Sequence, residues 1–361
     1  MKTKERFLKT CNFEPPDVIV TYDFVDHNEL LATYGGEEKN LIVRNARMMK
    51  AIGLDSTRYI HNPEHHWVWG KIETWKQFLG IDPSKWEVVE TGGTAWIKRP
   101  FKTVKELEQH LPRMPHRNEV ASWYRNWLKQ VKEVFDEFDL VWVTAVEGPL
   151  TDAYSYTDFG LFFETMIEAP ELIDYLLDVT TTFQEILAEV HAENPTSPVF
   201  FMNDDIAGTH GPIFSPKWLR ENMLPRWQRV YKPAKAAGLK CCFHSDGNLN
   251  LLMDLLVNEL KIDGLNPIEV NAGMDIRKIR RQYPHLLLFG NVCCATTLPH
   301  GTVEDVQQEV KGLLRDIAPT GGLFLGSSSE VHDLVPIENA VTMYKTAKQF
   351  GKYPIDVETL K

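Results

Sequence analysis

The sequence has few cysteines, and their placement argues against a disulfide framework. Only five of the 361 residues are cysteine, and four of them form the adjacent pairs Cys241-Cys242 and Cys293-Cys294 inside apolar runs. An odd count in such positions does not suit paired disulfides. Adjacent cysteines also lack the intervening residues that a zinc knuckle needs to turn the chain. We therefore expect reduced, buried thiols in a cytoplasmic protein.

Long apolar runs and basic clusters are missing as well. No stretch approaches the roughly 18 apolar residues of a membrane span, and the first residues lack the apolar core of a signal peptide. Lysine and arginine number 39 against 50 acidic residues, which gives a net charge of -11. An acidic chain without a basic stripe does not attract nucleic acid. We expect a small-molecule substrate and neither a nucleic-acid nor a membrane partner.

A low-complexity linker and a phosphate-binding glycine fingerprint are also absent, whereas strand-like apolar runs alternate with helical patterns from about residue 140. The runs cover residues 140–146, 198–202, 241–243, 264–265, 286–289 and 322–325. Six such repeats predict a parallel sheet with right-handed crossovers. One or two earlier strands, including residues 18–22, complete an α/β fold of the (β/α)8 TIM barrel type. A doubly wound sheet is the alternative, which the missing fingerprint disfavours.

The first part of the chain is less regular. Seven of the ten tryptophans lie between residues 67 and 127, and residues 86–98, with Gly92-Gly93 in the middle, predict a β-hairpin. We interpret residues 1–361 as a single barrel domain. In this interpretation residues 1–135 are an N-terminal elaboration and residues 136–361 carry the regular strand–helix repeats.

Polar side chains follow the predicted strands where each strand ends. In a parallel barrel these ends meet at one mouth, where the active site lies. The clearest case is residues 240–248, in which a short apolar run ends in His244 and Asp246. Other strand ends supply Glu147, Asn203, Asp204, Asp205, Asn266, Glu269, Asn291, Cys293, Ser328, Ser329 and Glu330. A histidine among carboxylates can bind a divalent metal or transfer protons, so this pattern predicts an enzyme.

Two neighbouring features qualify this expectation. Asp204 and Asp205 are consecutive, and successive strand side chains point to opposite faces, so only one of them is expected to face the mouth. His66 and Trp67 belong to the tryptophan-rich segment. That segment either covers the mouth and shapes a substrate pocket or serves as a solvated loop and packing.

Several motifs together resemble the uroporphyrinogen decarboxylase superfamily. They are Asn203-Asp204-Asp205 with Gly211-Pro212, Ser215-Pro216 and Pro225, then His244-Ser-Asp-Gly, Gly264-Leu-Asn-Pro267, Leu288-Phe-Gly290-Asn and Pro336-Ile-Glu-Asn339. The resemblance covers nearly the whole chain. It implies a (β/α)8 barrel with the site at the C-terminal ends of the strands, and it leads us to expect a homodimer.

The superfamily contains two chemistries, and this chain departs from both. The decarboxylases clamp a polycarboxylate with an arginine-rich motif, whereas the equivalent residues 22–27 contain no arginine and two acids. An acidic mouth would repel such a substrate. The corrinoid-linked methyltransferases hold zinc through a His-x-Cys motif and a later cysteine. Here His244-Ser-Asp246 replaces the motif, and Ser329 or Ser328 stands near the later position. Oxygen ligands would then take the place of sulfur.

The resemblance implies a methyltransferase-like enzyme. It would move a methyl group from a small methoxylated or N-methylated compound to a thiol or to a corrinoid carried by a separate partner protein. Zinc or another divalent metal would assist. A cofactor-free decarboxylase acting on a small carboxylated substrate is the alternative, and a catalytically silent binding protein on the same barrel is a third reading.

The candidate residues follow from these readings. We assign catalytic roles to His244, Asp246, Asp205 and Glu147, metal ligation to His244, Asp246, Glu147, Ser329 and Glu330, and substrate binding to Tyr22, His66, Trp67, Asn203, Asn266 and Asn291.

Overall fold

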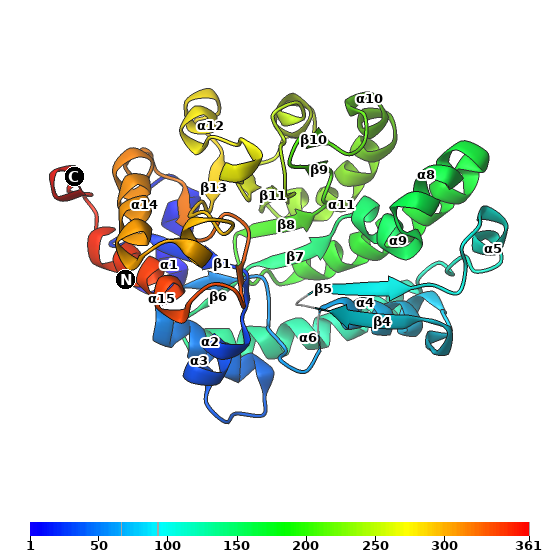
Figure 1. Cartoon of the computed structure of the whole chain (residues 1–361), viewed down its shortest axis with the longest axis horizontal. Coiled ribbons are helices and arrows are strands. Elements are labelled where there is room, and N and C mark those ends of the chain that lie inside the picture. The colour runs from blue at the N-terminus through cyan, green and yellow to red at the C-terminus, as the bar shows by residue number, and fades with distance from the viewer. Residues whose placement is uncertain (66, 92–93, 361) are drawn as a thin grey trace.

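The computed structural model, which describes residues 1–65, 67–91 and 94–360, confirms the predicted TIM barrel (Figure 1). The described strands of the sheet follow the order β6-β3-β1-β14-β13-β12-β11-β8-β7, and all neighbours are parallel. β6 (Val141–Trp142) and β7 (Thr144–Glu147) are separated by Val143 alone. They act as one continuous strand that pairs first with β3 and then with β8. This strand closes the sheet into an eight-stranded barrel.

The remaining barrel strands are short. They are β1 (Val20–Asp23), β3 (Ser56–Thr57), β8 (Val199–Asn203), β11 (Lys240–His244), β12 (Gly264–Asn266), β13 (Leu287–Phe289) and β14 (Leu323–Leu325). The six runs predicted from residue 140 onward are all strands. The second early strand is β3, whose two residues carry too little apolar sequence to be recognised.

Helices surround the barrel and connect its strands. The longer ones are α1 (Thr3–Cys11), α2 (Asn28–Gly35), α3 (Leu41–Ile52), α4 (Trp67–Thr74), α6 (Arg117–Glu137), α7 (Pro149–Thr157), α8 (Phe159–Glu168), α9 (Pro170–Glu193), α11 (Leu224–Ala236), α14 (Val303–Asp316) and α15 (Ile337–Phe350). The short ones are α5 (Val104–Glu108), α10 (Pro216–Trp218), α12 (Ile276–Gln282) and α13 (Thr297–His300).

Shorter elements occupy the connections. Three are π-helical, namely η1 (Trp75–Leu79), η3 (Leu219–Met223) and η4 (Leu255–Glu259). The 3-10 turns are η2 (Pro83–Lys85), η5 (Val270–Ala272), η6 (Ala318–Thr320) and η7 (Val357–Leu360). Small strand pairs are β2 (Val25–Asp26) with β15 (Val331–His332), β9 (Ala207–Gly208) with β10 (Gly211–Pro212), and the hairpin β4 (Glu87–Thr91) with β5 (Thr94–Lys98). The hairpin confirms the prediction for residues 86–98, although Gly92 and Gly93 lie outside the described residues.

Side chains alternate along the strands between two cores. In β8, Phe201 belongs to a cluster inside the barrel, whereas Phe200 belongs to the larger core between strands and helices. Phe7 of α1 joins the inner cluster and lies 4.7 Å from Phe324, measured between ring centroids. The first helix therefore seals the N-terminal end of the barrel. All five cysteines are free, and four of them are buried.

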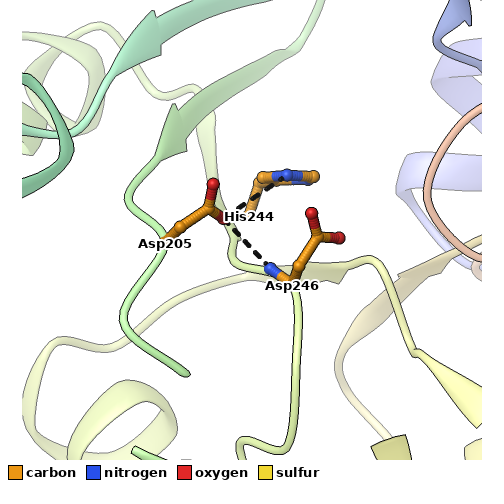
Figure 2. Close-up of side chains that lie close together, drawn as sticks. All are labelled: Asp205, His244 and Asp246. Carbon is orange, nitrogen blue, oxygen red and sulfur yellow. Dashed lines mark hydrogen bonds and ion pairs between the residues drawn. The ribbon is translucent and has the colours of Figure 1, made fainter. Parts of the chain in front are cut away.

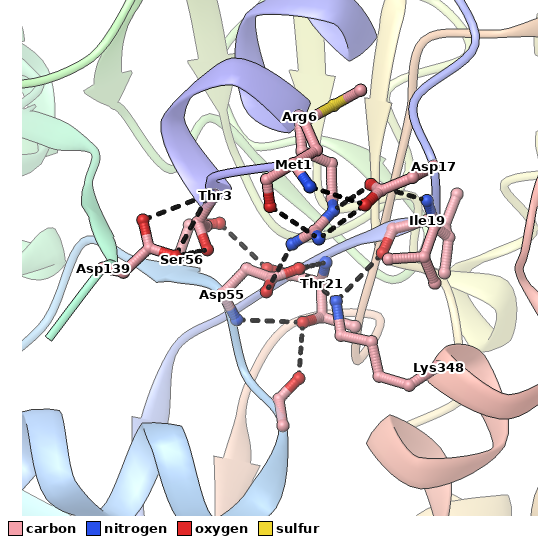
Figure 3. Close-up of polar contacts among 12 residues, drawn as sticks. Met1, Thr3, Arg6, Asp17, Ile19, Thr21, Asp55, Ser56, Asp139 and Lys348 are labelled. Carbon is pink, nitrogen blue, oxygen red and sulfur yellow. Dashed lines mark hydrogen bonds and ion pairs between the residues drawn. The ribbon is translucent and has the colours of Figure 1, made fainter.

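A polar network joins the two ends of the chain at the sealed end of the barrel (Figure 3). Asp55, just before β3, accepts a hydrogen bond from the backbone amide of Thr21 and pairs with the ammonium group of Lys348 on α15. Arg6 of α1 lies 3.6 Å from the same carboxylate and 2.7 Å from Asp17. These contacts fix α1, β1 and α15 to one another.

Candidate functional site

Three ionisable side chains from two neighbouring strands meet at the open end of the barrel (Figure 2). His244 ends β11 and pairs in register with Asn203, the last residue of β8. Because the backbone continues past this pair in both strands, Asp205 and Asp246 lie side by side just beyond the strand ends. One ligand atom of each of Asp205, His244 and Asp246 lies within 4.8 Å of the others. We call these residues the Asp–His–Asp cluster.

The imidazole of His244 is oriented by the next strand. Its Nδ1 lies 2.7 Å from Oδ1 of Asn266 on β12, which can only accept a hydrogen bond, and this short contact favours the tautomer with the proton on Nδ1. The guanidinium of Arg58, which can only donate, lies 3.1 Å from Nδ1 and 3.5 Å from Nε2 and opposes that tautomer at Nδ1. Nε2 also lies 3.8 Å from a carboxylate oxygen of Asp205. Burial, together with the positive charge of Arg58, keeps the pKa of His244 well below its usual value. A neutral imidazole with a free Nε2 is the form that binds metal ions.

The two carboxyl groups of the cluster have the opposite shift. Burial raises the pKa of both Asp205 and Asp246, the charge of Glu147 adds to the shift of Asp205, and the charge of Asp205 adds to that of Asp246. Hydrogen bonds partly oppose this shift. Asp205 accepts from the backbone amide of Asp246 at 3.1 Å, and Asp246 accepts from the hydroxyl of Ser329 at 2.9 Å. The pair therefore holds a proton near neutral pH unless a cation compensates the charge.

Asp204 has a structural role, as expected if only one of the consecutive residues Asp204 and Asp205 faces the mouth. Its carboxyl group is fully buried and accepts hydrogen bonds from the backbone amide of Thr151 at 2.7 Å and from the indole of Trp227 at 2.6 Å. Burial raises its pKa to about 7. Gly148 packs so closely that a Cβ atom there would lie 2.0 Å from Cγ of Asp204. Asp204 thus anchors the start of α7 beside the site.

A cavity of about 450 Å³ opens beside the cluster. Its polar walls carry five carboxyl groups and two bases, from Glu147, Asp152, Asp205, Asp246, Glu330, Arg58 and Lys71. Burial raises the pKa of Glu330, with Asp26 nearby adding to the shift. The excess of negative charge favours a cation in the cavity.

Arg58 and Lys71 were not expected from the sequence. The guanidinium of Arg58, just beyond β3, donates to the hydroxyl of Tyr22 at 2.9 Å and lies 3.1 Å from Nδ1 of His244. The buried ammonium of Lys71 on α4 lies 3.2 Å from Glu147 and 3.3 Å from Asp152. The positive charges of Arg58, which follows a two-residue strand, and of Lys71, in the tryptophan-rich segment, make the mouth less acidic than the sequence predicted. A pattern of apolar runs could not reveal either residue.

The other predicted site residues fall into three groups. Glu147, Asn203, Ser329 and Glu330 line the cavity. Tyr22, Asn266 and Asn291 are buried and hold neighbouring groups by hydrogen bonds. Tyr22 contacts Arg58, Asn266 contacts His244, and Asn291 donates to the backbone carbonyl of Ile268. His66 and the side chain of Trp67 lie outside what the structure describes. The two acids at residues 23 and 26 point elsewhere, Asp23 to Ser327 and Asp26 to His61.

The cluster suits a divalent metal ion better than the ligand set predicted from the sequence. One imidazole nitrogen and two carboxylate oxygens are a donor set that zinc and other divalent ions use, with open positions for a substrate. Asp205 belongs to the cluster, whereas Glu147 is occupied by Lys71. Ser329 supports Asp246 through a hydrogen bond. The positive charges of Arg58 and Lys71, which line the same cavity, oppose a cation there.

Comparisons with known proteins bear on the fold. No family model and no curated protein matches the chain. A solved methyltransferase from Methanosarcina mazei is 21% identical, covers 97% of this chain and 99% of its own length, and superposes with a TM-score of 0.69. Two further solved structures are less similar. One is to a pneumococcal exo-β-D-N-acetylglucosaminidase module, at 9% identity over 92% of this chain and 85% of that one with a TM-score of 0.47. The other is to a Parabacteroides distasonis sugar phosphate isomerase/epimerase, at 10% over 94% and 97% with 0.44.

The comparison with the methyltransferase establishes a shared barrel over nearly the full length of both chains. At 21% identity it shows the fold alone. The resemblance to the uroporphyrinogen decarboxylase superfamily is not confirmed by a family model and stays a prediction. Among the described residues, none of the helices is both long and apolar enough to cross a membrane.

Proposed function

We propose that the protein is a metal-assisted methyltransferase. It removes a methyl group from a small methoxylated or N-methylated compound and passes it to a thiol or to a corrinoid on a partner protein. The observation that carries the proposal is the Asp–His–Asp cluster at the wall of a cavity sized for a small molecule. The full-length likeness to a methyltransferase structure agrees with it.

The residues of the site have separate roles in this proposal. Nε2 of His244 and carboxylate oxygens of Asp205 and Asp246 hold the cation, and Asn266 fixes the imidazole by its hydrogen bond to Nδ1. The bound cation supplies positive charge that weakens the bond between the methyl group and its oxygen or nitrogen. Glu330 lines the same cavity, and its raised pKa favours the protonated carboxyl group. In this proposal Glu330 donates the proton that the leaving oxygen or nitrogen takes up.

A decarboxylase is the second candidate, and Arg58 favours it. In the described part of the chain its guanidinium contacts the hydroxyl of Tyr22, the neutral imidazole of His244 and the ring of Phe24, none of which carries a charge. Such a group could bind a substrate carboxylate. The proton shared by Asp205 and Asp246 would then pass to the substrate carbon as its bond to the departing carbon dioxide breaks. This chemistry requires the cluster without a metal ion.

Metal content separates the two candidates. Elemental analysis of the purified protein is predicted to find about one divalent ion per chain. The ion should be lost in His244→Ala and retained in His300→Ala, which removes an exposed histidine that does not line the cavity. Methyl-corrinoid formation from a panel of methoxylated and N-methylated compounds should follow the metal content. A protein that stays metal-free after supplementation would contradict methyl transfer and favour the decarboxylase.

A further inference from the structure

The cavity extends beyond the Asp–His–Asp cluster into a second compartment, which none of the proposed steps uses. Its walls are apolar and come from η1, α6 and α9, namely Trp75, Leu79, Trp123, Phe183 and Leu187. α6 and α9 pack against each other, and α4 leads directly into η1 on the same flank of the barrel (Figure 1). We call this space the apolar compartment.

The compartment lies behind the barrel wall. Ala145 of β7 packs against the core inside the barrel, whereas its neighbour Val146 belongs to the core between strands and helices. Both residues line the same cavity. The cavity therefore passes over the end of β7, from the barrel mouth into the space between that strand and the helices.

Charged groups mark the passage between the two parts. Lys71 bridges Glu147 and Asp152 there, and Nε2 of Gln184 donates to Asp152 at 2.5 Å. Lys71 offsets one of the two carboxylate charges, and burial raises the pKa of Asp152, so the passage carries little net charge and a ligand that passes it need not supply a charge of its own. An ionised group placed deeper, among the aromatic walls, would lose its hydration without a partner.

One polar atom of this wall has no partner. Gln184 is 2% exposed, and its Oε1 forms no hydrogen bond with the described residues. A buried acceptor without a donor costs stability, and a bound ligand that offers a donor removes this cost. The wall that contains Gln184 also contains Phe183 and Leu187 from the same helix.

We propose that the apolar compartment binds an uncharged ring that carries one hydrogen-bond donor, as in a phenol or an aromatic amine. The ring lies among Trp75, Trp123 and Phe183, since aromatic walls favour stacked or edge-on rings. Its O–H or N–H donates to Oε1 of Gln184, an atom that is itself buried, so the side-chain amide turns toward the ring on binding. With the proposed function, on which this last step rests, the ring is the body of the substrate and its methyl-bearing group points toward the cluster.

Phenol and toluene test the compartment without metal or turnover. Isothermal titration of the wild type is predicted to show tighter binding of phenol, because only phenol satisfies Gln184. In Gln184→Met the preference should reverse, with phenol weakened roughly tenfold relative to toluene. Gln130→Met, an exposed site on α6, is the matched control and should behave as wild type. Absence of binding to the wild type, or an unchanged preference in Gln184→Met, overturns the proposal.

A second variant keeps the test valid if Gln184→Met fails to fold. Leu187→Trp should fill the compartment and abolish binding of both probes, and unchanged binding would count against the proposal. Metal content is measured on the same samples. Ring binding in a metal-free protein would overturn the methyltransferase and leave the compartment intact. Metal binding without ring binding would overturn the compartment proposal and leave the methyltransferase proposal intact.

Discussion

Nδ1 of His244 and Oδ1 of Asn266 lie 2.7 Å apart, joined across two parallel strands that place the residues opposite each other. The amide of one strand thereby favours one tautomer of the imidazole on the next. Nε2 of this imidazole lies 3.8 Å from Asp205 in the wall of the cavity. This arrangement resembles the orienting hydrogen bonds that support histidine ligands in metal sites.

Removing the orienting amide should weaken metal binding. Asn266→Ala leaves Nδ1 without its partner, and the imidazole can rotate or change tautomer, so we expect metal affinity to fall about 10- to 100-fold. Titration with zinc against a competing chelator measures the change. Asn250→Ala, at an exposed position, is the control. Equal affinities in the wild type and Asn266→Ala would show that this hydrogen bond does not position a ligand.

Asp23 predicts a dependence of stability on pH. Its carboxyl group is buried below the rim, accepts from the amide of Ser327 at 2.8 Å and from the hydroxyl of Tyr344 at 2.8 Å, and has a pKa raised by burial to about 6. The folded state thus binds its proton more tightly than the unfolded state. Its contribution to stability is present below about pH 4 and is lost as the pH rises to about 6, on the order of 3 kcal/mol in total.

Urea denaturation of the wild type and Asp23→Asn at several pH values measures this contribution. The difference in unfolding free energy between the two proteins should shift in favour of the variant between pH 4 and 7. The sign follows because only the wild type has a carboxyl group to ionise at this place. A difference that stays constant with pH would mean that the buried carboxyl group keeps its ordinary pKa.

The ion pair between Asp55 and Lys348 should hold the first and last parts of the chain together (Figure 3). Lys348→Met leaves a nearly buried carboxylate with Arg6 as its remaining basic neighbour, and we expect a loss of about 3 kcal/mol in unfolding free energy. Lys345→Met changes an exposed lysine on the same helix and should cost little. If both variants unfold at the same urea concentration, the network does not stabilise the fold.

Gly148 should not tolerate a side chain. An added Cβ would overlap the carboxyl group of Asp204, which anchors α7, so Gly148→Ala is expected to destabilise the protein by about 1–3 kcal/mol. Gly208→Ala is the control, because a Cβ there meets no atom within 4 Å. Thermal unfolding of both variants decides the point. A stable Gly148→Ala protein would show that Asp204 can move without loss.

The barrel was predictable because its strands after residue 140 are apolar runs that end in polar residues. β3 escaped prediction, since two residues cannot form a hydrophobic pattern, and Arg58 escaped with it.

The candidate site was predictable in part for the same reason. Strand ends identified His244, Asp246 and Asp205, and the structure brings these three together. Their contacts depend on register between strands, which the sequence does not specify. Lys71 reaches Glu147 from a helix 76 residues earlier in the chain. No spacing rule relates the two positions, so the pairing that removes Glu147 from the cluster could not be foreseen.

Anomalous diffraction at the zinc edge, from crystals grown with zinc, would show whether the Asp–His–Asp cluster binds the ion. We expect a single strong peak about 2.0–2.2 Å from Nε2 of His244 and from carboxylate oxygens of Asp205 and Asp246. The peak should vanish in crystals of Asp246→Asn grown in the same way. A peak centred elsewhere in the cavity, or no peak in crystals soaked at a saturating zinc concentration, would contradict a metal site at the Asp–His–Asp cluster.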